Sequence, residues 1–370
     1  MRLLPLLCLL LSFALPAHAK VPPKNKRGPR DMLLVAGGDV AYPRGWMDAL
    51  VERRKEAMFE QVRGFAKAAE LAFVNLESPY SDKAFKIRKT YQVVTPPHRL
   101  DYVLSGGFNL FSLANNHMAD AGEEGIADTL ALLEKKREGN KHLWWAGAGR
   151  TVKEAWKPRV FTVPGKKLKV AFHAFGYAGS KLVPVPSEAQ AIELVTTWSK
   201  KVDISIVSIH HGTEYRHVPA KEKAAMYRRF VEAGADVLLG HHPHVVQGVE
   251  RYKNGIIFHS LGNFSFASKT VRHKKTGAKL YSMLPLVYIK DAKVERVEIV
   301  PLYANNAESW KLNGKTLRPV DFTPQVLHGD FATAMLSELK EWTDQIPGIA
   351  SEAAAALTIQ GERGVVQVRK

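Results

Sequence analysis

Two histidine clusters carry the chemistry that this sequence could perform. His210 and His211 close one apolar run, and His241, His242 and His244 close another. Imidazole is the most common metal ligand among protein side chains, so a metal site is the leading interpretation. The alternative is a chance grouping of surface or core histidines. The pattern predicts two buried strands that deliver their histidines to the same edge of a sheet.

Oxygen-bearing side chains close three other apolar runs. They are Asp39 after a Gly-Gly pair, Glu77 in a Val-Asn-Leu-Glu segment, and Asn116 in an Asn-Asn-His segment. Oxygen and nitrogen donors without sulfur suit a divalent transition metal such as Mn, Fe or Zn. Asp39, Glu77 and Asn116 together with three of the histidines would make six ligands. Six ligands exceed the needs of one tetrahedral ion, whereas two ions about 3.5–4 Å apart would use them all. We expect Glu77 to bridge such a pair, because one carboxylate can serve both ions.

Alternating strand-like and helix-like segments would position these residues. Helices are expected at 46–70, 123–136, 188–200, 221–233 and 331–342. Strands are expected at 31–40, 69–78, 108–117, 167–177, 202–212, 235–244 and 255–266, followed by a hairpin within 281–303 that turns near 291–293. Strands alternating with helices and then pairing with one another predict a single layered α/β sandwich domain.

The N-terminus is expected to be a cleavable secretion signal over residues 1–19, because one arginine precedes a short leucine-rich core and an Ala-His-Ala end. Residues 20–30 would form a flexible lead-in, 31–321 the folded domain, and 322–370 a partly helical C-terminal extension. Cleavage would remove Cys8, the only cysteine, and with it any thiolate ligand, cysteine nucleophile or disulfide. We therefore expect an exported protein, in the periplasm or at the cell surface.

The charge balance favours a polyanionic partner. The formal net charge is +17, which suits nucleic acid, anionic lipid headgroups, teichoic-type polymers or polyglutamate. Export and the lack of any helix-turn-helix, zinc-finger or RNA-binding signature argue against nucleic acid. The basic run of Lys83, Lys86, Arg88 and Lys89, with Tyr91, could hold a polyanion. The alternative is that these lysines and arginines form a solvated loop and only keep the protein soluble.

The segment from Asp31 to about Asn306 resembles the CapA family of capsule synthesis, which is named for work on poly-γ-glutamate. The matching pieces are 37–40 (GGDV), 75–78 (NLES), 114–122 (ANNHMADAG), 147–149, 210–215 with Pro219, 234–247 and 260–266. The domain of that family is similar to calcineurin-type metallophosphoesterases. The resemblance therefore implies a layered α/β/β/α sandwich of the metallo-dependent phosphatase type.

The resemblance also implies roles for individual residues. Asp39 would hold the first metal ion, Glu77 would replace the usual bridging aspartate, and Asn116 would bind the second ion. His117 would act as general acid, oriented by Asp120. The metal shells would be completed by His210, His242 and His244, while His211, His241, Glu214 and Asn263 would bind substrate or support the ligands from behind.

Three positions depart from the superfamily pattern. Its Asp-x-His opening appears here as Asp39 followed by Val40 and Ala41, so one histidine ligand is absent. Met118 stands where an acidic residue usually follows the Asn-His pair, and His211 stands where the capsule family often has an aromatic residue. The missing histidine leaves both one ion and two ions open.

The preferred hypothesis is an exported, metal-dependent hydrolase or transferase of capsule or cell-envelope biosynthesis. Its substrate would be an anionic envelope polymer such as poly-γ-glutamate, and the metal would activate water to attack a phosphoryl or γ-glutamyl carbonyl centre. One alternative is a non-catalytic scaffold that holds the polymer for membrane-bound synthase components. Another is a metallophosphoesterase with a phosphoester substrate. The sequence has no Gly-x-Ser-x-Gly elbow, which argues against a serine hydrolase.

Overall fold

The computed structural model describes most of the chain. Its described residues are 24–45, 47–84, 92–176, 182–183, 185–267, 271–304 and 308–369, with only the backbone for residues 25, 271, 272 and 274. Several sequence predictions lie outside the described residues, namely the secretion signal at 1–19 and the basic-loop residues Lys86, Arg88, Lys89 and Tyr91.

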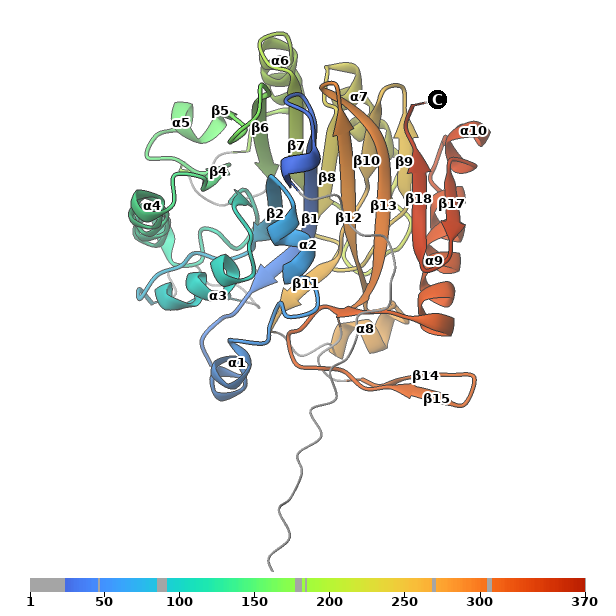
Figure 1. Cartoon of the computed structure of the whole chain (residues 1–370). Helices are drawn as coiled ribbons and strands as arrows, with labels where there is room; N and C mark the ends of the chain where they lie inside the picture. The colour runs from blue at the N-terminus through green and yellow to red at the C-terminus, as the bar shows by residue number, and fades with distance from the viewer. Residues whose placement is uncertain are drawn as a thin grey trace, which may run out of the picture.

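Two β-sheets pack face to face and enclose the main hydrophobic core (Figure 1). The larger sheet has the order β17 (Leu357–Gln360), β18 (Arg363–Gln367), β13 (Lys293–Tyr303), β12 (Tyr281–Lys290), β1 (Met32–Ala41), β2 (Leu71–Leu76), β3 (Leu110–Ser112) and β4 (Trp144–Ala146), with β11 (Asn263–Phe266) on β1 and β16 (Gln325–Val326) on β13. The smaller sheet has the order β5 (Arg159–Thr162), β6 (Lys169–Gly176), β7 (Ile204–His210), β8 (Val237–His241), β10 (Gly255–Phe258) and β9 (Val249–Tyr252). A separate hairpin joins β14 (Trp310–Leu312) to β15 (Lys315–Leu317).

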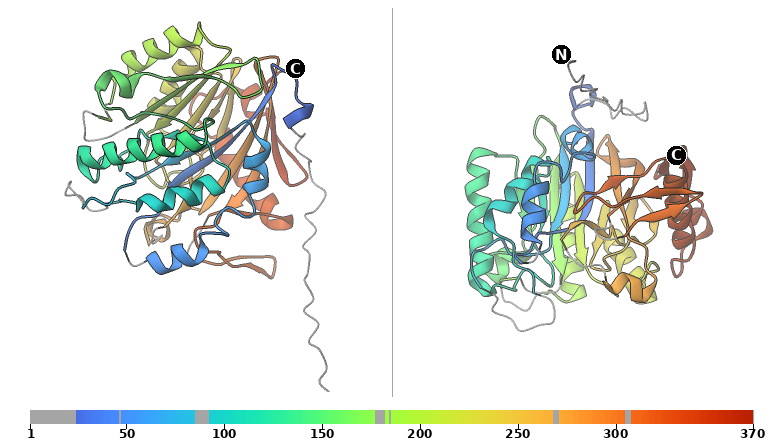
Figure 2. Two further views of the ribbon diagram at one scale, coloured as in Figure 1. Left: turned by 60° about the vertical axis from the view of Figure 1, so that its left-hand side comes forward. Right: turned by 90° about the horizontal axis from the view of Figure 1, so that it is seen from below.

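Helices cover the outer faces of both sheets, as Figure 2 shows. The larger sheet is covered by α1 (Asp48–Arg54), α2 (Arg63–Ala68), α3 (Leu100–Ser105) and α4 (Gly122–Gly139), and the smaller sheet by α6 (Glu188–Ser199) and α7 (Lys221–Glu232). The remaining helices are η1 (Lys24–Lys26), η2 (Pro97–Arg99), α5 (Val152–Trp156), α8 (Val271–Thr276), α9 (Gly329–Asp344) and α10 (Ser351–Ala354). The predicted α/β/β/α sandwich is confirmed.

The central strand β1 shows why the sequence folds this way. All ten of its residues are buried. Leu33 and Val35 pack against the helical layer, while Leu34 and Ala36 point into the core between the sheets. Because successive side chains of a strand face opposite sides, a strand covered on both faces needs an unbroken apolar run. Asp39 interrupts this apolar run and is the first of the predicted site residues along the chain.

Two of the expected elements are divided in the structure. The helix predicted over 46–70 is two short helices, α1 and α2, separated by turns that bury Met58 and Phe59 against the sheet. Because these turn residues are buried, the apolar residues of the segment recur at a helical spacing although the helix is not continuous. The strand predicted over 255–266 is β10 and β11, which belong to different sheets. Gly262, with a φ of 72°, lies between them where the chain crosses from one sheet to the other.

The C-terminal segment extends the sandwich. β18 pairs with β13 at the edge of the larger sheet, and α9 packs against both β13 and β9. The Thr343 hydroxyl accepts a hydrogen bond of 3.1 Å from the backbone N–H of Val249. Helix α9 thus closes the open side between the two sheets. Among the described residues, no helix combines the length and apolar character needed to cross a membrane.

The end of the expected lead-in makes specific contacts with the domain. Arg27 forms an ion pair with the buried Glu70 at 3.0 Å, and Lys166 lies 3.7 Å from the same carboxylate. The Lys166 amino group also donates to the Gly28 carbonyl at 3.1 Å. Residues 27 and 28 are therefore held against the N-terminal ends of the central strands.

Candidate metal centre

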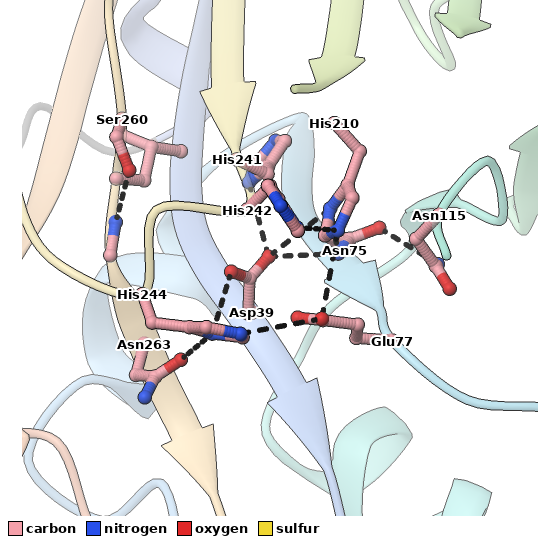
Figure 3. A network of polar contacts seen from close by, with 12 residues as sticks. Asp39, Asn75, Glu77, Asn115, His210, His241, His242, His244, Ser260 and Asn263 are labelled. Atoms are coloured by element: carbon pink, nitrogen blue, oxygen red, sulfur yellow. Dashed lines mark hydrogen bonds and ion pairs between the residues drawn. The ribbon is translucent and has the colours of Figure 1, made fainter. Parts of the chain in front are cut away.

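The side chains of interest lie where strands of both sheets end. Asp39 is in β1, Glu77 directly follows β2, and His210 is the last residue of β7. The loop after β8 carries His242 and His244. Figure 3 shows these side chains pointing toward one another from the two sheets. The convergence predicted from the strand ends is present, and it joins the C-terminal edges of two sheets rather than one.

The backbone register sets the centre of the site. Asp39 lies opposite Asn75 of β2 on one side and opposite Asn263 of β11 on the other. Gly38 permits this arrangement, because a Cβ atom at that position would lie 1.8 Å from the Gly262 carbonyl oxygen. The close approach of β1 and the chain before β11 therefore requires glycine. It places the Asp39 carboxylate between the two sheets.

A first group of donor atoms surrounds the Nε2 atom of His210. Asn116 Oδ1 lies 2.8 Å from it, His242 Nδ1 lies 3.1 Å away, and Glu77 Oε1 lies 3.6 Å away. Ligands bound tetrahedrally at about 2.1 Å from an ion are separated by roughly 3.4 Å. The carboxylate and the two imidazoles have ligand atoms that all lie within 4.8 Å of one another. This group has the donors and the size for one divalent ion.

A second group contains Asp39, Glu77 and His244, and its ligand atoms also lie within 4.8 Å of one another. Asp39 Oδ2 is 3.8 Å from His244 Nδ1, and Glu77 Oε1 is 3.9 Å from His244 Nε2. Among the described residues, buried Asp39 Oδ2 accepts no hydrogen bond. A buried carboxylate oxygen without a donor is costly unless a cation neutralises it. The two groups share Glu77, so this carboxylate lies between them.

Amide side chains hold the ligands in place. The Asn75 amide nitrogen donates to Asp39 Oδ1 at 2.8 Å and lies 3.3 Å from His210 Nδ1. Asn263 Oδ1 accepts from His244 Nδ1 at 2.9 Å, which leaves Nε2 of that ring for an ion. Support of this kind fixes the tautomer and orientation of a metal-binding histidine. The supporting role expected for Asn263 thus has a geometric basis, and Asn75 is an addition to the predicted site.

The other predicted residues belong to neither group of donor atoms. His241 is fully buried beside Asp39, with Nδ1 3.5 Å from Oδ1, and neither ring nitrogen forms a hydrogen bond to the described residues. His211 is half-buried, and its backbone N–H donates to the His241 carbonyl at 3.0 Å. Glu214 is half-buried in the loop after β7.

The proposed proton donor is held by a carboxylate. His117 Nδ1 lies 2.8 Å from Asp120 Oδ2, and this oxygen also accepts the backbone N–H of Val93 at 2.6 Å. His117 is 7% exposed, whereas Asp120 is completely buried. Burial is the main cause of the lowered pKa of His210 and His242, and His117 is near enough to add to both shifts. The contact with Asp120 fixes Nδ1 of His117, so proton exchange with a substrate would fall to Nε2.

Burial lowers the pKa of three histidines at the site. It lowers the pKa of His242 to about 3, with a further contribution from His244, and it lowers the pKa of His210 well below its ordinary value. Burial also lowers the pKa of His241 to about 4, against the opposing effect of Asp39. Metal binding needs the neutral imidazole, so His210 and His242 are in the form that binds an ion at neutral pH.

Two of these histidines have unusual backbone conformations. His242 has a φ of 92° and His244 a φ of 59°. Residues other than glycine rarely adopt positive φ, and each such residue costs about 1–3 kcal/mol of conformational free energy. Strain of this kind concentrates at functional sites, because the surrounding structure must hold it in place. The backbone of the loop after β8 is therefore strained in the conformation that places its imidazoles at the site.

Comparisons with known proteins identify the family. A model of the family described as bacterial capsule synthesis protein PGA_cap matches residues 33–268. The chain belongs to this family. It is similar to the capsule biosynthesis protein CapA of Bacillus anthracis, with 28% identity over 76% of this chain and 70% of that protein. It is also similar to the PGA biosynthesis protein CapA of Bacillus subtilis strain 168, with 27% identity over 77% of this chain and 75% of that protein.

Two solved structures are more distant from this capsule-family chain. A phosphatase from Mycoplasma pneumoniae aligns with 74% of this chain and 94% of its own, at 16% identity and a TM-score of 0.47. A hypothetical protein from Thermus thermophilus aligns with 80% of this chain and 99% of its own, at 17% identity and a TM-score of 0.43.

Proposed function

We propose that this capsule-family protein is a metal-dependent hydrolase or transferase that acts on an anionic envelope polymer. The observation that carries the proposal is the pair of donor groups that share Glu77. Carboxylate, amide oxygen and neutral imidazole are donors for Mn, Fe or Zn. The buried Asp39 oxygen that lacks a hydrogen-bond donor among the described residues supports the same fit. When bound, the metal would polarise the scissile group and make a water molecule more acidic.

The remaining chemistry falls to the side chains of this chain. Asn75 and Asn263 orient Asp39 and His244, which keeps the ligands in position during turnover. Asp120 holds the proton on Nδ1 of His117, so the imidazole can transfer a proton at Nε2. A positioned general acid of this kind contributes about 10²- to 10⁴-fold to a rate.

The polymer substrate is proposed on two grounds. The net charge of +17 favours a polyanion, and the relative from Bacillus subtilis is named a PGA biosynthesis protein. The leucine-rich segment 1–19 supports export to the periplasm or cell surface, where such a polymer and membrane-bound synthase components would be met. Nucleic acid is not a proposed partner.

A non-catalytic scaffold is the second candidate. It is favoured by Ala41, which is completely buried beside Val93 and Phe266 at the position where the superfamily carries a histidine ligand. A groove that only holds polymer would tolerate an incomplete metal shell. The third candidate is a metal-dependent enzyme that attacks a phosphoester. It differs from the first candidate only in the chemical group attacked.

One experiment separates these functions. The purified protein is loaded with Mn²⁺ or Zn²⁺ and incubated with poly-γ-glutamate and with a generic phosphodiester. Turnover of the polymer that is lost in His117→Asn, with the metal content unchanged, supports the proposed enzyme. Turnover of the phosphodiester alone favours a phosphoesterase. Tight binding of polymer without turnover of either compound would overturn the proposal in favour of the scaffold.

A further inference from the structure

Helix α7 carries a buried lysine, at a position where a positive charge costs free energy. Lys223 of α7 is 3% exposed, and its Nζ atom donates to Gln247 Oε1 at 2.9 Å and to the His259 carbonyl at 2.8 Å. Both acceptors are neutral. Among the described residues, no carboxylate lies within ion-pair distance of this amino group. Burying an ammonium without a paired carboxylate costs several kcal/mol, so its position calls for a compensating role.

The amino group joins loops that carry the proposed ligands. Gln247 follows the loop of His242 and His244, and its side-chain nitrogen donates to the Arg216 carbonyl in the loop after β7 at 2.7 Å. Its backbone N–H donates to the Ser260 carbonyl at 3.1 Å, in the connection from β10 to β11. The second acceptor of Lys223, the His259 carbonyl, lies in that same connection. One buried amino group thus links the chain segments after β7, β8 and β10.

The packing around this amino group is tight. Gly212 has a φ of 132°, and a Cβ atom there would lie 2.9 Å from Lys223 Nζ and 3.4 Å from Cγ of Pro243. Only glycine combines this backbone conformation with that space. The loop after β7 therefore passes directly against the lysine and against the loop after β8. The spacing between the two histidine loops depends on this contact.

The lysine also influences the ligands through its charge. Burial lowers the pKa of Lys223, and Asp39 opposes this shift. Burial also lowers the pKa of His241 and His242, and the charge of Lys223 adds to the shift in both.

We propose that Lys223 is a positioning residue for the metal centre. It holds the segments after β7, β8 and β10 at the spacing that lets His210, His242 and His244 approach Glu77. This inference rests on the proposed function, because it assumes that the centre takes an ion. Lys223 itself contacts neither ion nor substrate, and no residue of the predicted site belongs to its helix.

The test compares Lys223→Met with Lys221→Met, an exposed lysine two positions earlier on the same helix. The dissociation constant for Mn²⁺ is measured by calorimetry on the metal-free full chain, and folding is checked by circular dichroism. We expect Lys223→Met to bind the ion about 10- to 100-fold more weakly, the range seen when support of metal ligands is removed. Lys221→Met should differ less than twofold from the wild type, within the scatter of surface substitutions.

Two further variants keep the test decisive if Lys223→Met fails to fold. Gln247→Leu removes the link to the loop after β7 together with one of the two acceptors of Lys223, but keeps the bond to the His259 carbonyl. A smaller loss of affinity in the same direction is expected. Lys223→Cys, in a Cys8→Ser background, carries the only thiol and can be aminoethylated while unfolded, since Cys8 is the sole cysteine of the sequence. Refolding after this treatment restores an amino group at position 223 and should restore the affinity.

The outcomes distinguish the inference from the function on which it rests. A folded Lys223→Met protein with wild-type metal affinity and a lowered melting temperature would show that the lysine is merely structural. That result overturns the inference and leaves the proposed function intact. A wild-type protein that binds no Mn²⁺ and no Zn²⁺ overturns the proposed function instead.

Discussion

The two halves of the candidate metal centre share Glu77 but differ in what surrounds it. On one side, Asn116, His210 and His242 crowd around a single point, with Asn116 Oδ1 and His242 Nδ1 2.8 and 3.1 Å from His210 Nε2. On the other side, the described residues that join Glu77 are Asp39 and His244, with Oδ2 and Nδ1 3.8 Å apart. One half has four donors from four strand ends, and the other has three.

The difference has a local cause in β1. Asp39 and Ala41 are two residues apart on the same strand, so a histidine at position 41 would share the face of Asp39. Ala41 instead packs with Val93 and Phe266. Position 41 therefore supplies no donor atom, and the Asp39 half has one donor fewer than the other. We expect two ions to bind stepwise, the first in the four-donor half and the second more weakly beside Asp39.

The largest effect is expected from the residue that the two halves share. Glu77→Gln removes the charge common to both groups while keeping the side chain's shape, so neither ion should be retained after desalting. Elemental analysis of the protein, loaded with Mn²⁺ and passed through a desalting column, measures this. The control is Glu60→Gln at an exposed position, which should keep the wild-type content. Retention of one full equivalent by Glu77→Gln would show that the halves are independent.

Substitutions of one histidine on each side test the asymmetry directly. His242→Ala removes a donor from the first group, and His244→Ala removes one from the second. We expect His242→Ala to lose the tighter ion and His244→Ala to keep it and lose only the weaker one. Calorimetric titration with Mn²⁺ gives the number of ions and both affinities. Equal losses in the two variants would contradict stepwise binding.

The position of Asp39, Glu77 and the histidines could be predicted because each closes an apolar run. Parallel strands end at a common edge, so the sequence alone brings their last residues together. Asn75 lies in the segment that supplies Glu77, but no role was predicted for it from the sequence. Its hydrogen bond to Asp39 depends on the bulge that shifts the register of β1 and β2, which the sequence does not reveal.

Lys223 could not be found by the same reasoning. It lies on an amphipathic helix whose other lysine, Lys221, is exposed, and helical periodicity cannot tell a buried lysine from a solvated one. Its acceptors, Gln247 and the His259 carbonyl, lie in the connections after β8 and β10, which come next to α7 only in the folded chain. The same limit explains the divided helix at 46–70, where burial of turn residues produced the expected spacing.

A gain of function would sharpen the comparison further. Ala41→His restores the missing side chain beside Asp39, and we expect it to tighten the second ion about tenfold without changing the first. Because Ala41 is completely buried, the larger side chain should also destabilise the metal-free protein by about 1–3 kcal/mol. Calorimetry measures the two affinities, and thermal unfolding measures the cost. Ala41→Val, of intermediate volume and without a donor, separates the packing effect from the ligand effect.

The smallest expected effect is a pH dependence of stability that arises from the buried Lys223. Burial lowers the pKa of Lys223 from 10.5 to about 7, while Asp39 opposes the shift. Between these pH values the unfolded chain binds a proton that the folded chain has released, so the free energy of unfolding should rise with pH across that window. Below pH 7 both states carry the proton, and the penalty of burial is then fully present.

Chemical denaturation of the metal-free protein at several pH values measures this dependence, and Lys223→Met provides the matched control. The rise between about pH 7 and pH 10.5 should be present in the wild type and reduced in the variant. Lys221→Met, altered at an exposed site on the same helix, should keep the wild-type slope. If the wild type and Lys223→Met show the same slope, Lys223 keeps its proton in the folded protein.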